Sequence, residues 1–168
     1  DADGHFPEVP LGRRLESLTG ARLEAIDTLP GDSRGTVRMG ADAYSWQAWA
    51  EVLRPQAGTT SLVEHADQYY AGASAAVTRR MGNGSVTYIG VDTMDGALER
   101  RLVRQVYERA GVPIDDLPPG VYHDWRDGFH VAVNYSAAPV RLPVAPDSRV
   151  LVGTNPLAPA SALVWQEP

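Results

Sequence analysis

Apolar residues recur at three- and four-residue spacing in two segments, and this spacing predicts two amphipathic helices. The first lies between Pro10 and Gly20 and repeats Leu11, Leu15 and Leu18. The second begins at Thr93 or Asp95, ends at Ala110, and repeats Leu98, Leu102, Val103, Val106 and Tyr107. We expect Asp95 to cap its first turn, and Gly111 with Pro113 to end it.

Other segments show the two-residue alternation of a half-buried strand. Residues 21–26 alternate in this way, and residues 29–33 have turn chemistry. Residues 36–65 fit a strand face and a helix face equally well, but their Trp and Tyr content favours strand. A further strand is expected at residues 61–64.

The clearest hairpin signal lies in residues 75–90, where two β-rich runs are joined at a glycine-flanked turn. Asn83-Gly84 suits the two central positions of a type I′ turn, which both need positive φ. Val77, Val86, Tyr88 and Ile89 supply strand formers on either side. The pattern therefore predicts an antiparallel strand pair.

The last third of the chain predicts a meander of short strands. Proline fixes φ and donates no backbone hydrogen bond, so Pro118-Pro119 suits a semi-rigid connector. Strands are expected at residues 121–125, 129–135, 140–142, 149–152 and 162–165, with a turn at 126–128. The expected organisation is an α/β unit over 1–111, a linker over 112–119, and a small antiparallel β-sandwich over 120–168.

The residue 75–90 hairpin resembles the "PAVTRN..GKG..YYIG" hairpin of family 42 glycoside hydrolases, the β-galactosidases. Residues 49–53 and 65–72 are similar to the "W-x-E-x-L" and "Y-x-x-x-Y-A-G" runs that precede it in that family. The chain departs from the family at Ser74, where proline is usual, and at Arg80, where asparagine is usual. The likeness extends over nearly the whole chain.

This resemblance implies a non-catalytic C-terminal fragment of a retaining, cytoplasmic enzyme that hydrolyses terminal β-galactosides. It also implies that residues 1–111 are the later part of a Rossmann-like, glutamine-amidotransferase-like domain used in trimer assembly. A start at Asp1, without methionine, agrees with a domain taken from a longer protein. The expected partners are further copies of the chain or the remainder of the parent enzyme.

Composition narrows the function further. The 168-residue chain is 43% hydrophobic and has a net charge of −6, which argues against nucleic-acid binding. Its longest apolar runs are far shorter than the roughly 18 residues that a membrane-spanning helix needs. The absence of cysteine excludes disulfides, thiolate metal sites and a cysteine nucleophile.

Catalytic machinery is also missing from the sequence. A retaining glycosidase needs two carboxyl groups about 5 Å apart, and the family resemblance places its acid in an Asn-Glu pair. No asparagine here is followed by glutamate, and a (β/α)₈ barrel needs at least about 200 residues. His123 and His130 would need a third ligand such as Asp124 to hold a metal, so ordinary strand histidines are favoured. We expect no catalytic residue, cofactor or metal site.

Aromatic residues are the remaining candidates for a binding role, because sugars stack on exposed rings. The set comprises Tyr44, Trp46, Trp49, Tyr69, Tyr70 and Trp125. A carbohydrate-binding module would expose them as a sugar platform, whereas an assembly domain would place them in its core or at a subunit interface. The core or interface interpretation is favoured, and the sugar platform stays open as an alternative.

Overall fold

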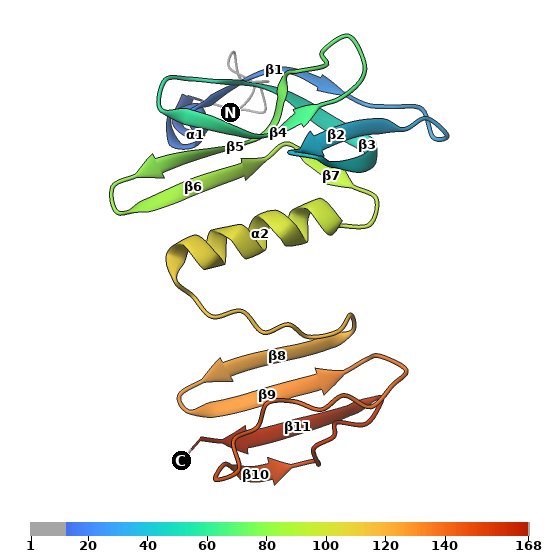
Figure 1. Cartoon of the computed structure of the whole chain (residues 1–168), viewed down its shortest axis with the longest axis vertical. Coiled ribbons are helices and arrows are strands. Elements are labelled where there is room, and N and C mark those ends of the chain that lie inside the picture. The colour runs from blue at the N-terminus through green and yellow to red at the C-terminus, as the bar shows by residue number, and fades with distance from the viewer. Residues whose placement is uncertain (1–12, 168) are drawn as a thin grey trace, which may run out of the picture. The chain divides into compact units, whose positions relative to one another are not determined.

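The computed structural model describes residues 13–167, which divide into an N-terminal unit that ends at Val112 and a C-terminal unit that begins at Pro113 (Figure 1). The described part of the first helix, α1, runs over Arg13–Thr19. Its predicted start at Pro10 lies outside the described residues.

The N-terminal unit is built on a seven-stranded sheet with the order β1-β3-β2-β4-β5-β6 and with β7 paired to β3. Its strands are β1 (Ala21–Asp27), β2 (Gly35–Met39), β3 (Asp42–Pro55), β4 (Thr59–His65), β5 (Ser74–Met81), β6 (Gly84–Ile89) and β7 (Val91–Thr93). The strand interpretation of residues 36–65 is thus confirmed. Leu53 of β3 also pairs with Ser74 of β5, so the sheet curls back on itself.

The predicted Rossmann-like arrangement is not found in the described residues, because every pairing in this sheet is antiparallel. The short connections explain the difference. Gly40 and Ala41 alone join β2 to β3, and Gly82 and Asn83 alone join β5 to β6. A two-residue loop can join only antiparallel neighbours, since a parallel pair needs a crossover of a dozen or more residues.

The core of the N-terminal unit forms around Trp46, which is fully buried with Val37, Val63 and Val91. A Cβ on Gly35 would lie 2.3 Å from the Trp46 ring, so only glycine lets β2 pass this side chain. The second helix, α2 (Ala97–Ala110), adds Leu98 and Leu102 to the same core. The predicted helix is therefore confirmed by its packing.

The ends of α2 differ in part from the prediction. The N-terminal cap position is Gly96 rather than Asp95, and the helix begins later than expected. Asp95 still accepts a hydrogen bond from the Ala97 amide at 3.0 Å. At the other end Gly111 adopts a φ of 69° and its amide bonds the Tyr107 and Glu108 carbonyls, as the sequence predicted.

The predicted hairpin forms, but its turn lies one residue earlier than Asn83-Gly84. Met81 pairs with Gly84, which leaves Gly82 and Asn83 as the central residues. Only Gly82 of these two has a positive φ, at 56°, which is the pattern of a type II′ turn. Glycine at the first central position satisfies that turn, so the type I′ prediction is wrong here.

The C-terminal unit is a four-stranded antiparallel sheet with the order β10-β11-β9-β8. Its strands are β8 (Val121–Arg126), β9 (Phe129–Asn134), β10 (Arg149–Val152) and β11 (Ser161–Gln166). The β8–β9 turn uses Asp127-Gly128, both with positive φ, as a type I′ turn requires. The predicted strand at 140–142 is reduced to a single bridge between Val140 and Leu157.

Irregular chain covers the inner face of this sheet, so the expected sandwich lacks a second regular sheet among the described residues. Leu142 and Leu157 come from this covering chain and pack with Leu163 and Trp165 of β11. Asn134, which is fully buried, holds the cover in place. Its amide nitrogen donates to the Ala138 and Leu157 carbonyls at 2.8 and 3.0 Å, and its Oδ1 accepts from the Ser136 amide.

Candidate assembly surface and histidine pair

Two of the predicted aromatic residues, Trp46 and Trp49, lie on opposite faces of β3. Side chains alternate along a strand, so residues three apart point in opposite directions. Trp46 enters the core and is 0% exposed, whereas Trp49 is 37% exposed. The two rings therefore cannot form one sugar platform, and Trp46 cannot contact a partner.

Two of the predicted tyrosines also make contacts within the chain. Tyr70 is buried and donates its hydroxyl to Asp27, and burial followed by this hydrogen bond raises its pKa well above the ordinary value. Tyr44 is half-buried against the core, and its hydroxyl accepts a hydrogen bond from Arg101 of α2 at 2.7 Å. Both rings therefore stabilise the fold.

The remaining three predicted aromatics are exposed but dispersed. Tyr69 is 87% exposed and makes an edge contact with Tyr70, with ring centroids 4.8 Å apart. Trp125 is 58% exposed and belongs to the C-terminal unit, unlike Trp49 and Tyr69. These positions favour the core and interface interpretation over a single carbohydrate platform.

Part of the apolar side of α2 that the sequence periodicity predicted is exposed. Leu98 and Leu102 fill the core side, whereas Val103 is 50% and Tyr107 46% exposed. Val106, beside them, lines a cleft of about 780 Å³ that also receives Arg80 and Arg109. We call Val103, Val106 and Tyr107 the α2 stripe. It is a candidate contact surface, because soluble domains usually cover such area.

A buried histidine, His65, lies at the centre of the N-terminal core. Its Nε2 lies 3.0 Å from the Glu51 carbonyl oxygen, and its ring meets Trp46 and Tyr70 edge-on. Its Nδ1 is buried and has no hydrogen-bond partner among the described residues. Burial lowers the pKa of His65 below 6.5, so the ring is held in its neutral form.

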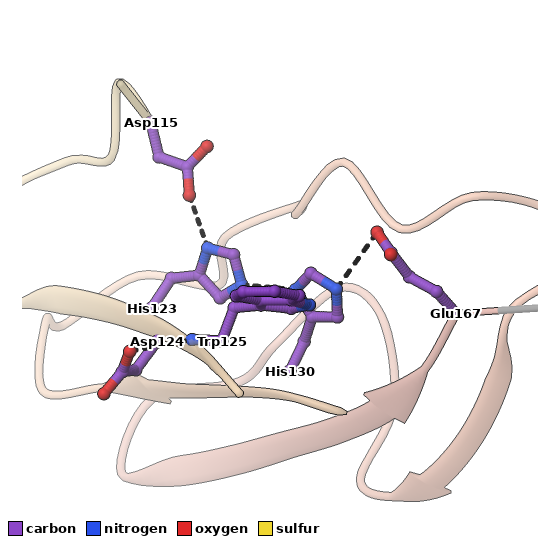
Figure 2. Close-up of polar contacts among 6 residues, drawn as sticks. All are labelled: Asp115, His123, Asp124, Trp125, His130 and Glu167. Carbon is purple, nitrogen blue, oxygen red and sulfur yellow. Dashed lines mark hydrogen bonds and ion pairs between the residues drawn. The ribbon is translucent and has the colours of Figure 1, made fainter. Parts of the chain in front are cut away.

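A second histidine site, in the C-terminal unit, pairs His123 of β8 with His130 of β9 (Figure 2). His123 Nε2 lies 2.9 Å from His130 Nδ1. The outer nitrogens face carboxylates: His123 Nδ1 bonds Asp115, and His130 Nε2 lies 3.1 Å from Glu167 Oε1. Both imidazole rings stack on Trp165, with centroid distances of 5.2 and 4.7 Å.

The sequence pattern could predict the two histidines of this site but not their carboxylate partners. A two-residue turn at 127–128 sets Trp125 opposite His130 and His123 opposite Ala132, so the hairpin register places both histidines on one sheet face. This register can be predicted from the turn residues in the sequence. The positions of Asp115 and Glu167 cannot be predicted in this way, because both reach the rings from irregular chain at the two ends of the unit.

The third metal ligand considered from the sequence, Asp124, turns away from the pair and accepts a hydrogen bond from the Trp125 amide (Figure 2). Within residues 13–167 no group of three or more histidine, cysteine or acidic side chains is placed to hold a metal ion. No helix in this part of the chain is long and apolar enough to cross a membrane.

Comparison with known proteins identifies the chain's relatives. Residues 1–113 match the family described as the β-galactosidase trimerisation domain. β-Galactosidase BgaH of Haloferax lucentense is 34% identical over 142 residues, which cover 84% of this chain and 21% of that protein. β-Galactosidase Bga of Halorubrum lacusprofundi is 31% identical, over 92% of this chain and 24% of that protein.

Solved structures agree with this assignment. The β-galactosidase of Halorubrum lacusprofundi superimposes with a TM-score of 0.81 at 29% identity, over 99% of this chain and 25% of that one. The β-galactosidase of Marinomonas ef1 shares the fold, with a TM-score of 0.75 at 24% identity, over 98% of this chain and 23% of that one. This chain spans about a quarter of the length of these proteins. It belongs to the β-galactosidase trimerisation domain family.

Proposed function

We propose that this chain is a non-catalytic assembly region of an enzyme that hydrolyses terminal β-galactosides. The match of residues 1–113 to a trimerisation domain is the observation that supports this proposal most strongly. The chain also aligns with only about a quarter of each β-galactosidase relative, and its sequence has no Asn-Glu pair. Assembly would join it to other copies of the chain or to the rest of its parent.

We further propose a trimer in which the α2 stripe contributes to the contact between protomers. Leu98 and Leu102 are buried in the core of the unit, and Val103 and Tyr107 leave apolar area of the same helix exposed. Trp49 and Tyr69 are the sequence-predicted interface residues of this unit that remain accessible. Residues 1–111 would then be the assembly domain, 112–119 a connector and 120–168 an accessory β-domain. The cytoplasmic location stays a prediction from family resemblance.

The proposal is tested by assaying hydrolysis and association on one preparation of the chain. Incubation with a chromogenic β-galactoside is expected to release no product above buffer, and cross-linking at micromolar concentration is expected to trap species up to a trimer. Hydrolysis that disappears on mutation of a residue in this chain would overturn the non-catalytic role. Failure to cross-link beyond a single chain would contradict the assembly role.

A further inference from the structure

We propose that His123 and His130 form a proton-binding site that holds one extra proton between two carboxylates. The site lies on the inner face of the C-terminal sheet, and four side chains follow one another in the order Asp115, His123, His130, Glu167 (Figure 2). Asp115 belongs to the segment before β8 and Glu167 to the segment after β11. The extra proton fastens both segments to the same sheet.

The contacts of the two rings set the number of N–H groups that the pair must carry. Carboxylates are ionised near neutral pH and only accept hydrogen bonds, so Asp115 requires a hydrogen on His123 Nδ1. His130 Nε2 lies 3.1 Å from Glu167 Oε1 as an ion pair outside hydrogen-bond geometry. A nitrogen lone pair at that distance from a carboxylate would be repelled, so this nitrogen also needs a hydrogen. The inner contact, 2.9 Å from His123 Nε2 to His130 Nδ1, requires one hydrogen as well. Three contacts therefore need three N–H groups, whereas two neutral imidazoles provide two. The complete arrangement is one imidazole and one imidazolium.

The surroundings favour this single positive charge. Both rings lie nearly parallel to Trp165, at 15° and 10°, and an aromatic face attracts a cation. His130 is only 9% exposed, so water competes little for its hydrogen bond to His123 and its contact with Glu167. A cation buried in this way is tolerated when it is paired, and a carboxylate lies at each end of the pair.

Charged and aromatic groups beside the pair on the same hairpin make other contacts. Asp124, on β8, directs its carboxylate to the Trp125 amide, and the Trp125 ring lies tilted, 6.4 Å from His130. On β10, the residue opposite Trp165 is the uncharged Val150. Arg126 and Asp127 pair with each other at the exposed end of the hairpin. The carboxylates that contact the rings are those of Asp115 and Glu167.

The count of hydrogens makes the site sensitive to pH in both directions. Loss of the extra proton leaves two N–H groups for three contacts, so a nitrogen lone pair then faces a carboxylate or another lone pair. Gain of a further proton places two N–H groups face to face across the inner contact. The two segments are thus fastened over an interval of pH and loosened on either side of it.

Nitrogen NMR of the full chain labelled with ¹⁵N-histidine counts these hydrogens directly. Near pH 6.5, the ordinary histidine value, we expect three of the four ring nitrogens of the pair to be protonated. The double variant Asp115→Ala/Glu167→Ala removes both acceptors, and we expect the count to fall to two. The matched control Asp124→Ala removes a carboxylate of the same strand that does not face the rings, and it should keep three.

Two separate neutral rings in the wild-type chain near this pH, or an unchanged count in the double variant, would overturn the proposal. If the double variant does not fold, the pH titration of the wild-type chain decides. The third hydrogen should leave in one step shared by both rings, and a fourth should appear only at clearly lower pH. Independent titration of the two rings as ordinary single histidines would overturn the proposal.

Discussion

The two units of this chain bury histidine in opposite ways. His65 lies among Trp46 and Tyr70 with a backbone carbonyl as its hydrogen-bond partner, and burial lowers its pKa. His123 and His130 also lie against an aromatic ring, but a carboxylate faces each end of the pair. Burial disfavours the charged ring, whereas a facing carboxylate favours it, so the two environments act on a histidine in opposite directions.

The units also differ in how their cores are closed. In the N-terminal unit the sheet curls on itself around the ring of Trp46. In the C-terminal unit irregular chain covers one sheet face, and the buried side chain of Asn134 holds it there. Apolar packing should therefore dominate the stability of the first unit, and polar anchoring should matter more in the second.

The largest expected effect is the loss of the Trp46 ring. Trp46→Ala leaves a cavity at a fully buried position, against which the backbone of Gly35 packs closely. We expect the free energy of unfolding of the N-terminal unit to fall by about 4 kcal/mol. Urea denaturation followed by circular dichroism measures it. Trp49→Ala, on the opposite face of the same strand, should cost less than about 1 kcal/mol. Equal losses for the two variants would refute the assigned core.

The next largest effect is expected on self-association, when the exposed surface of α2 in the N-terminal unit is made polar. Val103→Ser/Tyr107→Ser removes the exposed apolar area of the α2 stripe. If about 100 Å² of it is buried between protomers, association should weaken by about 2.5 kcal/mol, or roughly 50- to 100-fold in dissociation constant.

Sedimentation velocity over a concentration series measures this change. Tyr122→Ser is the matched control, because Tyr122 is 64% exposed in the C-terminal unit. If association weakens in the Tyr122→Ser control and stays unchanged in the α2 variant, the contact surface lies in the C-terminal unit and not on the α2 stripe.

The polar anchor of the C-terminal unit should show a smaller effect. Asn134→Ala leaves the Ala138 and Leu157 carbonyls without their side-chain donor, and we expect a loss of about 2 kcal/mol in that unit. Hydrogen exchange of the amides of β9 and β11 measures it unit by unit. The turn variant Asn83→Ala should leave this exchange unchanged. A loss confined to the N-terminal unit would contradict the polar-anchor account.

The pH dependence of the N-terminal unit gives the most gradual effect. The pKa of His65 is lowered in the folded chain, so below about pH 6.5 the unfolded chain binds a proton that the folded chain does not. The free energy of unfolding should therefore fall as the pH is lowered below about 6.5, by at most about 1.4 kcal/mol per pH unit, until the folded ring also protonates. Urea midpoints at pH 7, 6 and 5 should show a shallower slope in His65→Gln. Identical slopes would contradict a neutral His65.

Sequence periodicity was enough for the elements whose partners are close in the chain. Leu98 and Leu102 marked the buried side of α2, and Asp127-Gly128 marked the β8–β9 turn. The β5–β6 turn was misplaced by one residue, because glycines flank Asn83 on both sides and two turn types compete for them. The Rossmann-like expectation came from family resemblance and not from the short connections, which favour antiparallel pairing.

Contacts between distant segments could not be predicted in this way. Strand alternation places Trp46 and Trp49 on opposite faces once β3 is known, but which of the two faces is buried depends on β2, β4 and α2. The carboxylates at the histidine pair come from irregular chain, where neither period two nor period 3.6 applies. Local pattern therefore located the histidines and left their partners unknown.

Sedimentation equilibrium of the unmodified chain at micromolar concentration tests the assembly role most directly. A chain in the β-galactosidase trimerisation domain family that retains its contact surface should approach three times its mass of 18.1 kDa as concentration rises. A well-folded species that stays at 18.1 kDa throughout the series would contradict that role.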